Sequence, residues 1–171
     1  AAELIPPASL DEADVLARAG AFVLDLLPGP EGLTPDQAAC VVRTAAMIGA
    51  EGVRDKLTEF VGIGESRVID ELLRAWRRSD DPEGYARNVL ADVDFGDRTL
   101  EVRGWHRVRC LPHLNRLTSV TCYGDFSPLD SVALVPHLRR LELVQNEVVR
   151  DLSPMARSTT LRVLLLTTGC Q

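Results

Sequence analysis

A six-residue phrase occurs twice in this chain and constrains the fold more than any other feature. It reads PHLNRL at residues 112–117 and PHLRRL at residues 136–141. A less regular copy begins at Leu161, after nearly the same interval. The three copies share the frame L-x-x-L-x-L-x-x-N/C, whose members are Leu114, Leu117, Ser119 and Cys122; Leu138, Leu141, Leu143 and Asn146; and Leu161, Leu164, Leu166 and Gly169.

This period and frame are typical of leucine-rich repeats, in which each repeat contributes one strand to a curved parallel sheet. We expect repeats starting at residues 114, 138 and 161, preceded by an irregular first repeat near 97–113. A second phrase, DFSPL at 125–129 and DLSPM at 151–155, alternates with the first. Its proline suits the first turn of a short return helix behind a Ser or Asp cap.

Side chains that alternate with the inward leucines are expected on the concave sheet surface, where a protein partner would bind. Asn146 and Cys122 are expected where the chain turns away from the strand. The predicted partner-binding residues are charged at the first strand and apolar at the last: Thr99, Glu101 and Arg103; Arg116, Thr118 and Val120; Arg140, Glu142 and Val144; and Val163, Leu165 and Thr167.

Residues 1–95 have the 3.6-residue hydrophobic period of helices instead. We expect five helices of roughly 10 to 17 residues, joined by short loops into stacked helical hairpins. Start signals occur at Ser9, Thr34 and Asp81, and stop signals at residues 28–30 and at Gly62. The predicted fold is therefore α+β, an α/β solenoid with helical hairpins over 1–95 and repeats over 96–171.

The runs 48–53, 57–60, 71–78 and 81–90 resemble the HEAT-like helical segment that follows the nucleotide-binding core in bacterial NACHT proteins of the STAND NTPase class. In that family such a segment leads directly into leucine-rich repeats, and the same junction is expected here near Asp94. The excess of Arg over a single Lys is similar to sequences from high-GC actinobacteria. The resemblance implies a cytoplasmic sensor or regulatory segment in defence signalling, which binds a protein ligand or the NTPase core of its own polypeptide.

The nucleotide-binding chemistry of that family has no counterpart in this sequence. A P-loop requires G-x-x-x-x-G-K-[S/T], because backbone amides and the lysine hold the phosphates. The single lysine, Lys56, follows no such glycine loop, and Gly62 and Gly64 lead into Glu65-Ser66-Arg67. We therefore expect no enzyme and no cofactor. The alternative to a NACHT segment is a freestanding leucine-rich-repeat adaptor, and an unrecognised enzyme with a deep polar pocket is the third reading.

Composition limits the partners further. The net charge is −6, which argues against general nucleic-acid binding. No apolar run is long enough to span a membrane, and Ala1-Ala2-Glu3-Leu4 lacks a basic signal-like start, so a cytoplasmic location is expected. An arginine cluster remains, and a solvated rim is the favoured reading over a small basic patch; it comprises Arg98, Arg103, Arg107, Arg109, Arg116, Arg139 and Arg140.

The remaining reactive side chains have structural explanations. Cys40, Cys110, Cys122 and Cys170 lack C-x-x-C spacing and are expected to be reduced, small buried hydrophobes. A metal site joining Cys110 or Cys122 to His113 or His137 is the less favoured alternative. Glu65 and Glu71 are expected on outer helix faces, and Trp76 and Trp105 in the core or at the junction.

Two expectations concern the ends of the repeat region. Tyr85, Val89, Leu90, Val93 and Phe95 make the junction too apolar for a flexible linker, so both halves should share one core. At the other end, strand 161–166 has no polar cap. We therefore expect that the protein continues beyond Gln171, or that this edge meets a partner or another copy of the chain.

Overall fold

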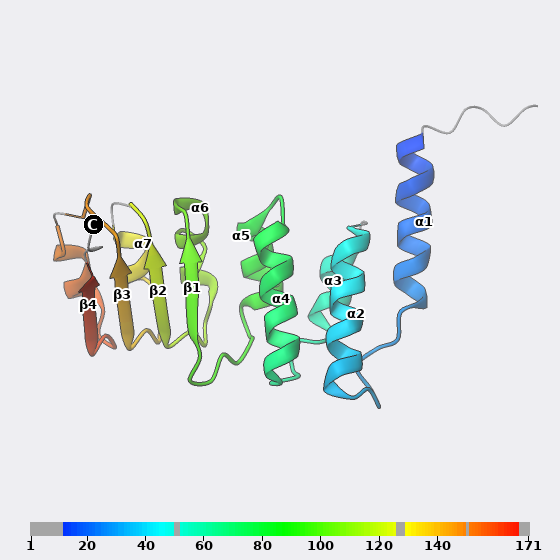
Figure 1. Ribbon diagram of the computed structural model, residues 1–171, viewed down its shortest axis with the longest axis horizontal. Coiled ribbons are helices and arrows are strands. Elements are labelled where there is room, and N and C mark those ends of the chain that lie inside the picture. Colours follow the sequence, from blue (N-terminus) through cyan, green and yellow to red (C-terminus); the bar gives the residue numbers. More distant parts are fainter. Residues whose placement is uncertain (1–11, 50–51, 126–128, 150, 168–171) are drawn as a thin grey trace, which may run out of the picture.

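The computed structural model describes residues 12–49, 52–125, 129–149 and 151–167. Its elements follow one another along the long axis in chain order, with helices in the first half and strands in the second (Figure 1). The α-helices of the first half are α1 (Glu12–Leu26), α2 (Pro35–Ile48), α3 (Val53–Thr58), α4 (Ser66–Arg78) and α5 (Pro82–Tyr85), and α5 continues into the π-helix η1 (Ala86–Leu90).

The second half contains a four-stranded parallel sheet in the order β1-β2-β3-β4, and the expected mixture of helices with a parallel sheet is confirmed. The strands are β1 (Thr99–Arg103), β2 (Ser119–Tyr123), β3 (Arg140–Val144) and β4 (Val163–Thr167). Short helices connect them, namely α6 (Trp105–Val108), η2 (Leu111–His113), α7 (Asp130–Ala133) and η3 (Ser153–Arg157).

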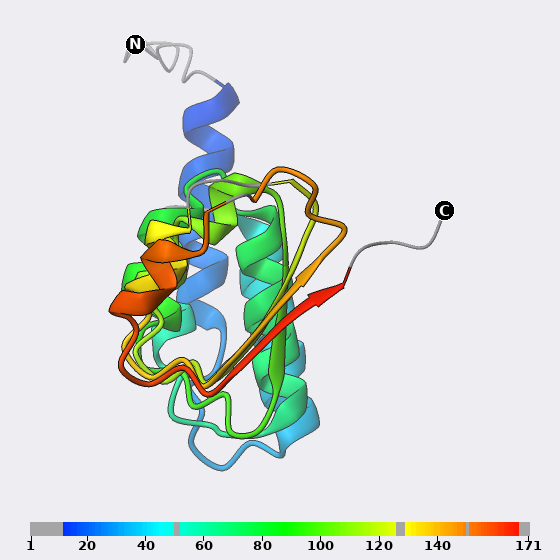
Figure 2. The same ribbon diagram turned by 90° about the vertical axis from the view of Figure 1, so that its left-hand side faces the viewer.

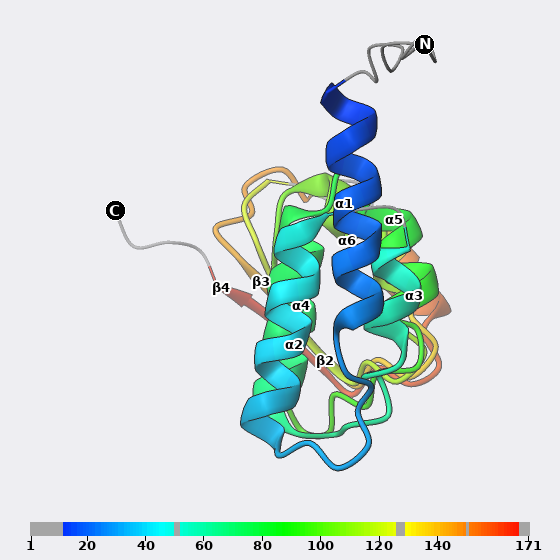
Figure 3. The same ribbon diagram turned by 90° about the vertical axis from the view of Figure 1, so that its right-hand side faces the viewer.

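The elements form two rows when the molecule is viewed along its long axis (Figures 2 and 3). One row contains α2, α4 and the four strands. The other contains α3, α5, α6 and α7, while α1 lies at the end of the molecule beside α2 and α3. The core lies between the two rows, so each strand has one face toward the short helices and one face that none of the described elements covers (Figure 2).

Capping residues mark the expected helix starts. Thr34 forms a reciprocal capping box with Gln37 at the start of α2, and the Asp81 carboxylate accepts a hydrogen bond from the Gly84 amide at the start of α5. Helix α2 is capped by Gly49, which follows Ile48 and whose φ of 63° is the left-handed conformation that a residue with a Cβ rarely adopts. The third predicted cap, Ser9, lies outside the described residues, as do Phe126 to Pro128 and Gly169.

The expected helix lengths are correct for α1, α2 and α4 and wrong for α3 and α5. After Thr58 the amides of Phe60, Val61 and Ile63 bond to carbonyls three residues back, so the chain tightens into successive turns before Gly64. Helix α5 has four residues because the backbone widens into the π-helix at Ala86. Hydrophobic period alone does not distinguish an α-helix from these tighter or wider turns.

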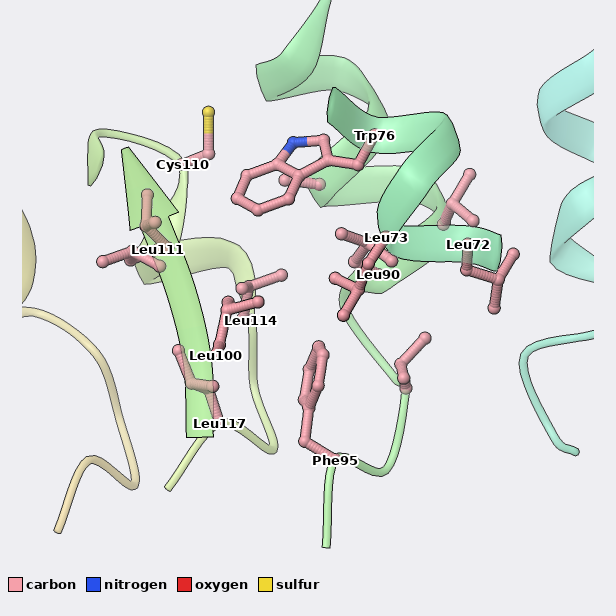
Figure 4. Packing of buried hydrophobic residues seen from close by; sticks show 14 of the residues in the cluster. Leu72, Leu73, Trp76, Leu90, Phe95, Leu100, Cys110, Leu111, Leu114 and Leu117 are labelled. Atoms are coloured by element: carbon pink, nitrogen blue, oxygen red, sulfur yellow. The ribbon is translucent and has the colours of Figure 1, made fainter. Parts of the chain in front are cut away.

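One buried apolar cluster extends from α1 to η3 through both halves of the chain. The predicted junction residues belong to it: Tyr85, Val89, Leu90, Val93 and Phe95 are each at most 3% exposed. Figure 4 shows Trp76, Leu90 and Phe95 facing Leu114 and Leu117 across the space between α4 and β1. The helical half therefore supplies the first face against which the sheet half packs.

Polar contacts join the two halves as well. Guanidinium groups from the sheet half donate hydrogen bonds to the backbone near both ends of α4: Arg98 to the Ser66 carbonyl at 2.8 Å, and Arg107 to the Arg77 carbonyl at 2.5 Å. The Arg77 carbonyl belongs to the last turn of α4, where carbonyls lack partners within the helix. Arg98 also pairs with Asp70. These contacts fix α4 alongside β1.

Candidate interaction site on the open face of the sheet

The uncovered face of the sheet presents three rows of side chains, each crossing all four strands. Strand pairing aligns Thr99 with Ser119, Ser119 with Arg140 and Arg140 with Val163, and the other two rows follow at steps of two residues. The second row is Glu101, Thr121, Glu142 and Leu165, and the third is Arg103, Tyr123, Val144 and Thr167. The residues of β1, β3 and β4 that were predicted on this face do occupy these rows; they include Arg103, Arg140, Glu142, Val144, Val163, Leu165 and Thr167.

The assignment of Arg116, Thr118 and Val120 to this face is wrong. The repeated phrase equates Leu117 with Leu141, whereas the strand pairing places Val120 opposite Leu141, so the predicted frame is displaced by three positions in β2. An odd displacement exchanges the two faces of a strand, because side chains alternate with a period of two. Val120 consequently points inward and is fully buried, while Arg116 and Thr118 precede the strand.

The position of the turn before each strand, relative to the repeated phrase, explains this displacement. Before β2 the turn lies at Asn115 and Arg116 and is closed by the bond from the Leu117 amide to the Leu114 carbonyl, whereas before β3 it lies at Pro136 and His137. Within the second copy, the amides of Arg139 and Arg140 both bond to the Thr118 carbonyl, and β3 begins at Arg140 itself. The two copies of the phrase therefore stand at positions that differ by three residues relative to the strands that follow them. Cys122, predicted at a turn, is an inward residue of β2 instead.

The expected role of Asn146 is confirmed. Its side-chain oxygen accepts hydrogen bonds from the amides of Val148 and Val149, at 3.1 and 2.9 Å, where the chain leaves β3. The step from β3 to β4 is also as predicted, since the strand pairing aligns Leu141 with Leu164 and Leu143 with Leu166, as the repeat frame does.

Hydrogen bonds between strands organise the middle of the open face. The Glu142 carboxylate accepts bonds from the hydroxyls of Thr121 and Thr167, each at 3.4 Å, and lies 3.8 Å from the Arg140 guanidinium. Ser119 and Thr121 are only 8% and 6% exposed, because longer neighbours on adjacent strands cover them. The centre of the face is therefore a shallow polar floor between longer side chains.

The two ends of the open face differ in character. At the β1 end, the Arg103 guanidinium lies over the Tyr123 ring, 4.8 Å from its centroid, which is a cation–π geometry. A hollow of about 380 Å³ adjoins Arg103 and is lined by Arg77, Glu101, Arg103 and Arg107. At the β4 end, Val163 and Leu165 are 38% and 36% exposed, so this end is largely apolar.

A larger hollow, of about 660 Å³, lies in the helical half between the end of α2, α3 and the end of α4. Several polar groups in its wall already bond within the chain. The Asp81 carboxylate accepts a hydrogen bond from the Gly84 amide and another from Arg54 at 3.0 Å, and these contacts hold the pKa of its carboxyl below the usual range. The Tyr85 hydroxyl donates to the Leu72 carbonyl, and burial raises its pKa. These groups act in helix capping and packing.

Glu71 is a buried carboxylate, and its predicted position on an outer helix face is wrong; Glu65 is exposed as expected. Arg43 of α2 and Arg74 of α4 each approach one carboxylate oxygen of Glu71 at 2.7 Å. The hydrogen bond from Arg43 lowers the pKa of Glu71 against the opposing effect of burial. The carboxylate thus joins α2 to α4, a role that the helical period did not indicate.

The cysteines differ in their surroundings. Cys110 and Cys122 are buried thiols as expected, and burial raises their pKa values to about 11 and about 12. Cys40 is exposed, so the prediction that it is buried is wrong, because its position on α2 faces away from α4; Cys170 lies outside the described residues. Among the described residues, no group of three or more His, Cys, Asp or Glu side chains is placed to hold a metal ion.

The arginine cluster is distributed rather than gathered into one patch. Arg98, Arg116 and Arg140 lie within ion-pair distance of Asp70, Asp94 and Glu142 respectively. Arg109 and Arg139 are exposed, and Arg103 and Arg107 line the smaller hollow. The hollow is also lined by Arg77, which was not among the predicted arginines because it lies in the helical half of the sequence, on α4.

Comparisons with protein-family models, with curated proteins and with solved structures found no match for this chain. In the described part of the chain, no helix has the length and apolar character needed to cross a membrane.

Proposed function

We propose that this chain is a non-catalytic sensor or regulatory segment of a NACHT-type signalling NTPase, and that its sheet half is a short stack of leucine-rich repeats that binds a protein. Its partner is a separate protein ligand or the NTPase core of the same polypeptide. In this proposal the segment acts in the cytoplasm and needs no cofactor of its own.

The observation that carries the proposal is the open face of the parallel sheet. Successive strands stay in register from Leu100 through Val120 and Leu141 to Leu164, and their inward residues form two apolar rows. The opposite face is uncovered, with a polar floor at Thr121 and Glu142 and an apolar end at β4. Such a mixed surface suits a protein partner, whereas nucleic acids require a generally cationic surface.

The helical half supports the same proposal. Helices α2 and α4 continue the row of strands, and α3 and α5 continue the row of short connecting helices (Figure 1). This arrangement agrees with HEAT-like hairpins that lead directly into repeats. A rigid connection between them suits a regulatory segment, because binding at the sheet is then transmitted to whatever precedes the helices.

Reading the coding sequence on both sides of residues 1–171 tests the NACHT origin. An upstream G-x-x-x-x-G-K-[S/T] motif in the same reading frame would support it. A start codon directly before Ala1 and a stop codon after Gln171 would instead favour the alternative, a freestanding leucine-rich-repeat adaptor. Both proposals keep the open face as the binding surface.

Photo-crosslinking tests the binding surface itself. A photoreactive amino acid is placed at Arg140 or Thr167 on the open face and, as a control, at exposed His137 in the turn before β3. We expect covalent adducts with one defined protein, or with the NTPase core in a longer polypeptide, from the open-face positions only. Equal labelling from His137 would show that the open face is not the binding surface.

A further inference from the structure

The small hollow at the end of β1 is lined by charged side chains that come from three elements. Arg77 lies at the end of α4, Glu101 and Arg103 belong to β1, and Arg107 belongs to α6. Within the part of the chain that the structure describes, none of these four side chains forms an ion pair. Three guanidinium groups around one carboxylate leave a local excess of positive charge on a protein of net charge −6.

Arg107 has a buried donor that lacks an acceptor. One of its terminal nitrogens donates to the Arg77 carbonyl, but its Nε–H is buried and bonds to no protein atom. A buried donor without an acceptor is unfavourable by an amount comparable to a lost hydrogen bond. The other buried side-chain donors and acceptors of the described residues do have partners, so this position is the exception.

The surrounding contacts hold the hollow in shape. The Arg77 carbonyl fixes the Arg107 guanidinium, and the Tyr123 ring supports the Arg103 guanidinium from one side. Both cations are therefore held in place before any ligand arrives, which lowers the entropic cost of binding. Arginine is suited to this role because its planar fork matches the two oxygens of a carboxylate.

We propose that Arg77, Arg103 and Arg107 form a binding site for the carboxylate of an acidic side chain, presented by the protein partner at the β1 end of the open face. The carboxylate would lie between Arg103 and Arg107 and accept the Nε–H of Arg107 after a small local adjustment. Arg77 would add a third positive charge from the end of α4. This proposal rests on the protein-binding role proposed above and extends it.

The chemistry of the hollow favours a carboxylate over a phosphate. Glu101 shares the hollow, and its negative charge opposes a dianion more strongly than a monoanion. The overall charge of −6 likewise disfavours an extended polyanion such as a nucleic acid. The site also adjoins Tyr123, an amphipathic side chain of the kind enriched where proteins bind one another.

The test is a titration with two short peptides, Ac-Gly-Glu-Gly-NH2 and its neutral counterpart Ac-Gly-Gln-Gly-NH2, followed by NMR of the arginine side chains. We expect the Glu peptide to shift the Nε–Hε signal of Arg107 saturably in the millimolar range, and the Gln peptide to leave it unchanged. Carbon-detected signals of the guanidinium carbons give the same readout where proton exchange broadens Nε–Hε. Added salt should weaken this binding, because the site is partly open to solvent.

The variants R77Q and R103Q should each weaken binding of the Glu peptide by about threefold to tenfold, the range expected for one charge-assisted hydrogen bond near the surface. The matched control is R109Q, which removes the same charge from an exposed residue outside the hollow and should change the affinity less than about twofold, the error of such titrations. R107Q is useful if it folds, but R103Q decides the result because Arg103 is exposed.

Three results would overturn the proposal: no shift with the Glu peptide, an equal shift with the Gln peptide, or equal weakening by R103Q and R109Q. Inorganic phosphate is titrated in parallel, and tighter binding of phosphate than of the Glu peptide would replace the carboxylate with a phosphate ligand. The peptides are free in solution, so this experiment can fail while crosslinking at the open face succeeds, and the reverse.

Discussion

Truncating Phe95 should destabilise both halves of the chain by the same amount. Its ring is 2% exposed and lies between the helical side chains and the leucines of the sheet half (Figure 4). Replacing a buried Phe with Ala costs about 3 to 5 kcal/mol, because apolar burial is lost and a cavity remains. For a chain of this size, that cost corresponds to a fall in Tm of about 6 to 20 °C. The shared core predicts a single transition that moves as a whole.

The two tryptophans allow each half to be followed separately. Trp76 lies in α4 and Trp105 in α6, so their fluorotryptophan signals report the helical half and the sheet half in one urea titration. We expect both signals to change at the same midpoint in the natural chain and in Phe95→Ala. The matched control is Phe22→Ala on α1, where the ring is 64% exposed and the change should stay within about 0.5 kcal/mol.

Two separated midpoints in the natural chain would refute the shared core. So would a Phe95→Ala variant in which the Trp105 signal moves while the Trp76 signal keeps its original midpoint. Limited proteolysis gives an independent check, because cleavage between residues 94 and 98 that released two folded fragments would exclude a rigid junction.

Three further predictions follow from individual side chains. Glu71→Gln should lower the free energy of unfolding by about 1 to 2 kcal/mol at pH 7, because charge-assisted hydrogen bonds to half-exposed arginines are lost. Since the folded state lowers the pKa of Glu71, this stabilisation is present above the pKa of the unfolded chain and disappears as acid protonates the carboxyl. The unfolding free energies of the two proteins, measured by urea titration, should therefore converge at low pH. In a Cys170→Ser background, iodoacetamide should modify exposed Cys40 readily and Cys122 only on unfolding, because burial raises the Cys122 pKa to about 12; rapid labelling of Cys122 in the native state would contradict this. Leu166→Asp at the edge strand should reduce any concentration-dependent self-association measured by sedimentation, whereas an unchanged sedimentation profile would show that this edge makes no contact.

Much of the fold could be predicted from the sequence because two periods are physically distinct. The helical period before residue 95 and the recurring leucines after it predicted helices followed by a parallel sheet. The junction was also predictable, since five apolar residues close together are incompatible with a solvated linker. These features depend on which positions are buried, and the spacing of apolar residues in the sequence indicates those positions well.

The residues of the site were harder to predict because register depends on backbone turns. The turn closed at Leu117 moves the start of β2, and this displacement brought Tyr123 rather than Val120 to the open face. The turn before β3 lies at Pro136 and His137, the first residues of the second copy, whereas the turn before β2 lies at Asn115 and Arg116, so the phrase itself does not fix the position of the turn. The position of Arg77 in the hollow likewise depends on how α4 lies against β1, which neither period specifies.

The location of the hollow follows from the change of element at the junction. Neighbouring strands lie about 4.8 Å apart, whereas a packed helix needs about 8 to 10 Å, so α4 cannot follow the free edge of β1 as closely as a strand would. Side chains fill this wider gap: apolar ones at Trp76 and Phe95 within the core, and arginines at its borders. Arg98 and Arg107 use the gap to reach the carbonyls of α4, and at the Arg107 end the gap opens onto the exposed face of β1. The junction that joins the two halves therefore also creates the charged recess beside the open face, and a ligand held there would contact the helices and the sheet at once.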